Sequence, residues 1–328
     1  MPKTVADISI TNDLELHPFS LKWDGNLMPI IKKKRTREQL LIWFFLAPSL
    51  AIFMLYRIIP LIWNGVLSFQ FWSPYKPSEF AGLYHYEEML FYDDAFRQSL
   101  WNTVIFMASS PIGIALALGI ALLVNTQIRG RGIYRTIVFM SYPVMTVAAA
   151  IIWKWLYNET VGLINYVLLS LGIVEKGIPF LESFEFALPS VIVASIWQVI
   201  GFYMIILLTG LQNIPPSLYE SAAIDGASAW QRFRRVTLPL LKPSIFLSFV
   251  IGIINSFTNF DLIYVMTQGG PSHATDLLIT YIYSVAFKLS KFDYAAAITI
   301  VNFLFFVFLA WFANRLSGGE AGAVDTGK

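Results

Sequence analysis

The side chains best suited to binding chemistry lie within two long apolar segments, residues 186–211 and residues 243–266. The second segment carries a polar stripe at helical spacing, and the first carries an amide followed one turn later by aromatic rings. Amides hydrogen-bond to hydroxyl groups and aromatic faces pack on CH groups, so this combination suits a sugar. The candidate substrate-path residues are Gln198, Phe202, Asn255, Ser256, Asn259 and Asp261.

The polar stripe also has a purely structural interpretation, because small and polar residues hold membrane helices together. Polar side chains within a membrane are costly and usually face a bundle interior or a water-filled path. Asp261 differs from the others, since it lies near the outer end of its segment. There it would line an access path or form a structural pair.

Catalytic chemistry is not indicated by the sequence. The three histidines are too scattered to suggest a metal site, and the absence of cysteine excludes disulfides and cysteine-ligated metals. No paired carboxylates or nucleophile elbow is visible. We therefore expect a protein that binds and moves a ligand, and not an enzyme.

The composition indicates an integral membrane protein whose helices position these groups. Of the 328 residues, 56% are hydrophobic and 13% are charged, and the mean hydropathy is +0.62. A soluble domain has about a quarter charged residues, and a membrane-spanning helix needs roughly 20 apolar residues. The pattern predicts an all-α fold with six transmembrane helices and with prolines 111, 143 and 189 inside three of them. The predicted spans are residues 40–66, 100–124, 133–155, 186–211, 243–266 and 294–313.

Charge asymmetry predicts the orientation of these helices. With an even number of spans, all the clusters of basic residues fall on one side, which the positive-inside rule assigns to the cytoplasm. Both termini are then cytoplasmic, and the opposite loops are rich in Asp and Glu. The basic clusters contain Lys32, Lys33, Lys34, Arg35, Arg37, Arg129, Arg131, Arg135, Arg232, Arg234, Arg235, Lys242 and Arg315.

The sequence of the cytoplasmic loop, residues 215–242, predicts two short helices joined by a glycine turn. Ser217-Leu-Tyr-Glu220 and Ser228-Ala-Trp-Gln231 each match a capping box, and Asp225-Gly226 between them is a turn signal. Such an amphipathic element has two interpretations. It could lie at the lipid surface, with aromatic residues in the interface and arginines at anionic headgroups, or it could dock on another protein.

The spacing of this loop resembles the EAA motif of binding-protein-dependent ABC importer permeases. The motif stands here as Glu220-Ser221-Ala222, then Gly226, Val236 and Leu238-Pro239, with every spacing intact. Ser221 replaces an alanine of the family pattern and Val236 replaces an isoleucine. The flanking segments, with TQGGP at residues 267–271, resemble the sugar-type subgroup, and the resemblance covers roughly residues 38–316.

The resemblance implies the transmembrane subunit of a carbohydrate importer in which this loop carries the coupling helix. Cofactors would be absent from this chain, because ATP and Mg²⁺ would bind to the partner ATPase. The implied partners are a second permease, two copies of the ATPase, an external solute-binding protein and membrane lipid, without nucleic acid. The implied location is the bacterial inner membrane. The expected coupling residues are Glu220, Ser221, Ala222, Asp225, Gly226, Leu238 and Pro239.

The resulting domain organisation has three parts: a cytoplasmic arm at residues 1–37, a transmembrane domain at 38–316 and a flexible tail at 317–328. Residues 1–31 of the arm are expected to be mostly disordered. The expected substrate is an oligosaccharide, and this class includes acidic, alginate-like oligosaccharides. The alternatives are a glycerol-phosphate-type importer and an ion-coupled carrier, in which Asp261 or Arg57 would be the coupling group.

Overall fold

A computed structural model describes residues 27–74, 76–126 and 129–316 of the chain. The described chain is almost entirely helical, with one two-stranded antiparallel hairpin. The predicted all-α class is therefore confirmed. The predictions for residues 1–26 and 317–328 lie outside the described residues.

The described part of the N-terminal unit, residues 27–60, is a single run of helix. Helix α1 (Leu27–Phe53) leads into a π-helical turn, η1 (Met54–Ile58), and α2 (Ile59–Leu67) follows. The apolar part, Leu41–Leu67, is long enough to cross a membrane and matches the first predicted span. The mostly disordered state predicted for residues 1–31 is wrong for residues 27–31, because helix α1, which contains no glycine, begins at Leu27.

A hairpin and two short helical elements follow the first span. Strand β1 (Gln70–Ser73) pairs with β2 (Lys76–Phe80), and Gln70 lies opposite Phe80. The chain continues through α3 (Tyr84–Glu87) and η2 (Glu88–Tyr92).

The second predicted span is formed by two helices with a short interruption. Helix α4 (Asp94–Ala108) is capped by Asp93, whose carboxylate accepts a hydrogen bond from Phe96 N at 2.9 Å. Helix α5 (Ser110–Asn125) continues the span, with Pro111 in its first turn. A proline there is tolerated because its missing N–H has no partner within the helix.

The third predicted span is not one helix. Helix α6 (Arg131–Phe139) and α7 (Thr146–Leu156) are separated by a non-helical segment, residues 140–145, that contains Pro143. Proline clashes with the preceding turn and removes a backbone donor, so the helix stops before it. The continuous span predicted for residues 133–155 is therefore wrong.

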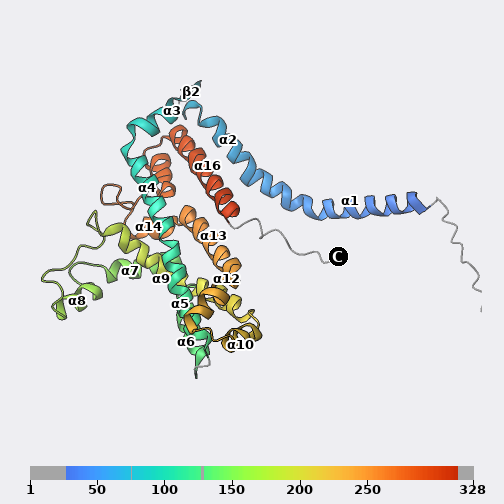
Figure 1. The fold of residues 1–328 in the computed structure, drawn as a ribbon. Coiled ribbons are helices and arrows are strands. Elements are labelled where there is room, and N and C mark those ends of the chain that lie inside the picture. The colour runs from blue at the N-terminus through green and yellow to red at the C-terminus, as the bar shows by residue number, and fades with distance from the viewer. Residues whose placement is uncertain (1–26, 75, 127–128, 317–328) are drawn as a thin grey trace, which may run out of the picture. The chain divides into compact units, whose positions relative to one another are not determined.

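Helix α9 (Ala187–Gln212) is the central helix of the larger unit and matches the fourth predicted span; α8 (Leu163–Ser170) precedes it. It lies beside α5 and α13 (Lys242–Thr258), as Figure 1 shows. Its side chains Met204 and Leu207 are fully buried in the core between these helices.

The fifth predicted span is also interrupted. Helix α13 ends at Thr258, Asn259 leaves the helical conformation with φ −79° and ψ 72°, and α14 (Phe260–Met266) follows. On the other side, α13 is bent by 62° from the preceding loop helices. The continuous span predicted for residues 243–266 is therefore wrong at Asn259.

The last part of the chain contains α15 (Leu278–Tyr283), η4 (Ser284–Lys288) and α16 (Phe292–Leu316). Helix α16 contains the sixth predicted span. By length and composition, the described chain has four helices able to cross a membrane, or five if the bent pair at α13 is one span.

Candidate transport cavity and coupling loop

A cavity of about 390 Å³ opens at the two helix interruptions of the larger unit. One wall is the non-helical segment between α6 and α7, and another is the break at Asn259 between α13 and α14. Broken membrane helices expose backbone groups that are tolerated where they line a cavity. The lining residues are Tyr142, Val144, Met145, Thr146, Gln198, Val199, Phe202, Ile251, Asn255, Thr258, Asn259, Phe260 and Asp261.

Gln198 joins α9 to the first interruption. Its side-chain amide nitrogen donates to the backbone oxygen of Val144 at 3.2 Å and to Thr146 Oγ1 at 3.1 Å. Gln198 is only 8% exposed. Its amide nitrogen supplies a donor to the carbonyl of Val144, which the helix break leaves without a helical partner.

An aromatic pair forms the next part of the wall. The rings of Phe202 and Tyr142 are stacked, with centroids 4.5 Å apart and planes 11° apart. Tyr142 was missed by the sequence reasoning, although the Tyr142-Pro143 pair inside an apolar segment was a usable signal for a break. Stacked rings present an apolar face, which suits the CH groups of a sugar.

The polar stripe of α13 divides between two cavities. Asn255 and Asn259 line the main cavity, and the Asn259 amide nitrogen donates to Ser195 Oγ at 3.4 Å. Asn255 also lines a smaller cavity, together with Tyr203. Ser256 lies elsewhere: it is 1% exposed, donates to Gly252 O at 2.9 Å and faces this smaller cavity of about 20 Å³.

Asp261 completes the set. It lies in the first turn of α14, is exposed and lines the main cavity. The structure thus brings five of the six predicted path residues to the main cavity. Ser256 lines only the smaller cavity, together with Asn255, which lines both.

The loop between α9 and α13 has the predicted helix–turn–helix form. Helix α10 (Pro216–Ile224) ends in a Schellman motif, in which Gly226 N bonds to Ala223 O and Ala227 N bonds to Ala222 O. Gly226 has φ +75°, a left-handed conformation that costs a residue with a Cβ atom about 1 kcal/mol.

The two capping boxes have different outcomes. The box at Ser228 is confirmed, since Gln231 N donates to Ser228 Oγ and Ser228 N donates to the Gln231 side chain. The box predicted at Ser217 and Glu220 is wrong. Pro216 takes the first helical position of α10, which places Ser217 inside the helix.

The second half of the loop is α11 (Ala229–Arg232), η3 (Phe233–Thr237) and α12 (Leu238–Leu240). Tyr219 of α10 and Thr237 of η3 are hydrogen-bonded through their hydroxyl groups at 3.0 Å. This bond joins the first loop helix to η3, which precedes α12 and α13. The predicted coupling residues Glu220, Ser221, Asp225, Gly226, Leu238 and Pro239 are exposed, and Ala222 is half-buried.

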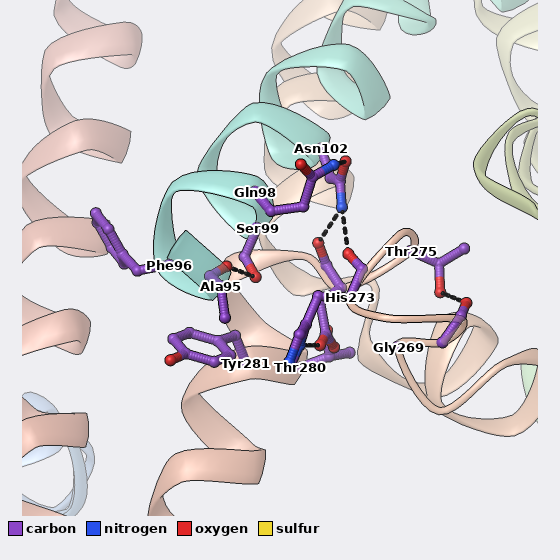
Figure 2. A network of polar contacts seen from close by, with 12 residues as sticks. Ala95, Phe96, Gln98, Ser99, Asn102, Gly269, His273, Thr275, Thr280 and Tyr281 are labelled. Carbon is purple, nitrogen blue, oxygen red and sulfur yellow. Dashed lines mark hydrogen bonds and ion pairs between the residues drawn. The ribbon is translucent and has the colours of Figure 1, made fainter. Parts of the chain in front are cut away.

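A polar network that the sequence did not predict holds the loop that contains TQGGP and continues to Asp276 (Figure 2). Within this loop, Thr275 Oγ1 donates to Gly270 O at 2.8 Å. The amide nitrogen of Asn102 donates to the backbone oxygens of His273 and Asp276 at 2.9 and 3.0 Å. The Asp93 carboxylate accepts from the Tyr281 hydroxyl at 2.6 Å. Burial, and then this carboxylate, raises the pKa of Tyr281 above its usual range, so its hydroxyl stays a donor at neutral pH.

Long apolar helices around a polar cavity, with a structured loop at one end, define an integral membrane transport protein. Residues 109–318 match the family described as binding-protein-dependent transport system inner membrane component, and the chain belongs to this family. The loop of residues 215–242 carries the EAA motif of these ABC transporter permeases.

Individual relatives agree with this assignment. The chain is 33% identical over 265 residues to a probable ABC transporter permease protein of Brucella suis, with 79% of this chain and 90% of the relative covered. It is 32% identical over 288 residues to the trehalose/maltose transport system permease protein MalF of Thermococcus litoralis, with 86% and 94% covered. A solved bacterial ABC transporter that imports the acidic polysaccharide alginate has a chain with TM-score 0.74 and 28% identity, covering 87% of this chain and 97% of that one.

Proposed function

We propose that the chain is the transmembrane subunit of an ATP-driven importer that moves a carbohydrate across the bacterial inner membrane. The main cavity carries this proposal. Three amide side chains, Gln198, Asn255 and Asn259, face one space together with the stacked rings of Tyr142 and Phe202. Amide donors and acceptors complement sugar hydroxyls, and the aromatic faces complement sugar CH groups. The trehalose/maltose permease and the alginate transporter support a carbohydrate as the substrate class.

The topology that we propose has six spans with both termini in the cytoplasm. In this arrangement α6 with α7, and α13 with α14, each form one broken span. The basic residues of the loops then face the cytoplasm together, in agreement with the positive-inside rule. The division into an arm at 1–37, a transmembrane domain at 38–316 and a tail at 317–328 is part of the same proposal.

The loop helix α10 is proposed to dock on the ATPase. Its motif positions Glu220, Ala222 and Gly226 match the EAA pattern, and Glu220 is exposed and free to pair with a basic residue of that partner. Nucleotide-driven closure of the ATPases would move this helix and switch the cavity between inward-open and outward-open states. ATP and Mg²⁺ would bind to the partner, and the hydrolytic chemistry would take place there.

The assembly would contain a second permease, two ATPase copies and an external solute-binding protein. A solved alginate ABC transporter in complex with a periplasmic protein that carries an alginate pentasaccharide supports the last of these. Two other functions are weighed against this one. A glycerol-phosphate-type importer would need a site for an anion, and an ion-coupled carrier would use Asp261 or Arg57 as its coupling group.

Reconstitution of the complete transporter in liposomes tests the proposal. Uptake of a labelled carbohydrate should require ATP on the ATPase side and the solute-binding protein on the other. Uptake that continues without ATP and follows an imposed ion gradient would favour the carrier instead. Uptake of glycerol phosphate, without uptake of any carbohydrate, would favour the second importer class.

A further inference from the structure

The main cavity has an unusual charge balance. Its lining contains one carboxylate, Asp261, and no Lys, Arg or His among the described residues that form it. The remaining polar groups are uncharged amides and hydroxyls. A ligand in this part of the path therefore meets a single fixed negative charge from this chain.

The carboxylate of Asp261 has no ionic partner within the described part of the chain. Its side chain is exposed, and it lies in the first turn of α14 on the wall of the main cavity. The ion pairs in the described ranges join Asp94 to Arg97, Asp276 to His273, Asp293 to His85 and Glu88 to Lys291.

A basic residue on the adjacent element is directed to an aromatic ring instead. The Lys288 ammonium lies 5.2 Å from the ring centroid of Tyr264. That ring stacks on Phe260, a lining residue next to Asp261, with centroids 5.0 Å apart. Lys288 itself does not line the cavity, so its ammonium group adds no positive charge to the lining.

We propose that Asp261 determines specificity by excluding anionic sugars, and that the substrate is a neutral carbohydrate. The inference rests on the proposed function. A neutral sugar can donate its hydroxyl hydrogens to the carboxylate in charge-assisted hydrogen bonds. A uronate or phosphate brought to the same place loses hydration and meets a like charge. The substrate class thereby differs from that of the alginate transporter, which imports an acidic polysaccharide on a similar fold.

Binding of paired probes to the purified, complete transporter tests this. Maltotriose and trigalacturonate are the first pair, within a panel of neutral oligosaccharides and uronates of matched length. For the native protein we expect the neutral probes to bind at least about tenfold more tightly, since a like charge near a protein surface costs on the order of 1.4 kcal/mol or more. The ratio of the uronate Kd to the neutral-sugar Kd should fall to about threefold or less in Asp261→Asn. In the native protein, about 1 M salt should also lower this ratio, because salt screens the charge of Asp261.

Two variants control for structural effects. Asp261→Glu keeps the charge and should keep the ratio. Asp94→Asn removes a carboxylate that is 90% exposed and outside the cavity, and should leave the ratio unchanged.

Each failure has its own outcome. A native transporter that binds uronates as tightly as neutral sugars, or an Asp261→Asn variant with an unchanged ratio, overturns the role of Asp261 while the carbohydrate assignment stands. A native transporter that binds no carbohydrate of either set overturns the proposed function and this inference with it.

Discussion

The hydroxyl groups of Tyr219 and Thr237 lie 3.0 Å apart and join α10 to η3, the turn that precedes α12 and α13. Thr237 is buried and Tyr219 packs against the core cluster of α5 and α9. Because η3 continues through α12 into α13, which carries Asn255, the bond connects α10 to the segment that leads to the cavity wall. We expect a displacement of α10 to be transmitted to the cavity through this segment.

Removal of that bond should weaken coupling without unfolding the protein. Tyr219→Phe keeps the ring and its packing but loses a hydrogen bond whose net contribution is about 1 kcal/mol. We expect ATP hydrolysis to continue while less substrate is transported per ATP, as measured in proteoliposomes. Tyr166→Phe, at an exposed position of α8, is the matched control. An unchanged transport-to-hydrolysis ratio in Tyr219→Phe would show that the bond does not contribute to coupling.

Charge reversal at Glu220 should abolish uptake while the protein remains in the membrane at normal levels. The side chain is exposed, so Glu220→Lys leaves the packing of α10 intact and changes only what a partner meets. Glu175→Lys, another exposed charge reversal, is the control and should transport normally. The measurements are ATP-dependent uptake and co-purification of the ATPase. Normal uptake in Glu220→Lys would remove this helix from the coupling interface.

Gly226→Pro should also abolish uptake, for a conformational reason. Proline holds φ near −65° and has no N–H, whereas Gly226 has φ +75° and donates to Ala223 O. The Schellman turn that sets the angle between α10 and α11 would be lost. Gly226→Ala should be milder, because its Cβ atom would meet nothing within 4 Å and only the backbone conformation is strained. Equal uptake in both variants would argue against the turn as a determinant of coupling.

The sequence predicted the apolar segments and the coupling loop well, because hydrophobic length and fixed motif spacing are local signals. It failed where local and tertiary signals compete. The helix break at Pro143 depends on the carbonyl of Val144 finding a donor in Gln198, which lies 54 residues further along the chain. Ser256 is excluded from the main cavity because of its angular position around the axis of α13. A stripe of small polar residues in the sequence does not specify which side of the helix faces the cavity.

Close packing between α9 and α6 gives a stability prediction. A Cβ atom at Gly201 would lie 2.5 Å from the backbone oxygen of Val138, so Gly201→Ala must push α6 away from α9. We expect a loss of about 1–3 kcal/mol, which is typical of overpacking, and a lower melting temperature in detergent. Gly119→Ala is the control, because its Cβ atom would meet nothing within 4 Å and alanine favours the α5 helix. A lower melting temperature for the control than for Gly201→Ala would contradict the packing argument.

Substitutions in the polar stripe of α13 should rank by the cavity that each side chain faces. Asn259→Leu removes an amide from the main cavity while keeping similar volume, so substrate-stimulated ATP turnover should fall about tenfold, as for loss of one or two hydrogen bonds. Ser256→Ala removes only a hydroxyl that is bonded within its own helix and should change turnover less than twofold. Both variants should assemble normally with their partners, which co-purification measures. A larger effect from Ser256→Ala than from Asn259→Leu would mean that the substrate path follows the smaller cavity between α5, α9 and α13, and that the main cavity is a consequence of helix packing.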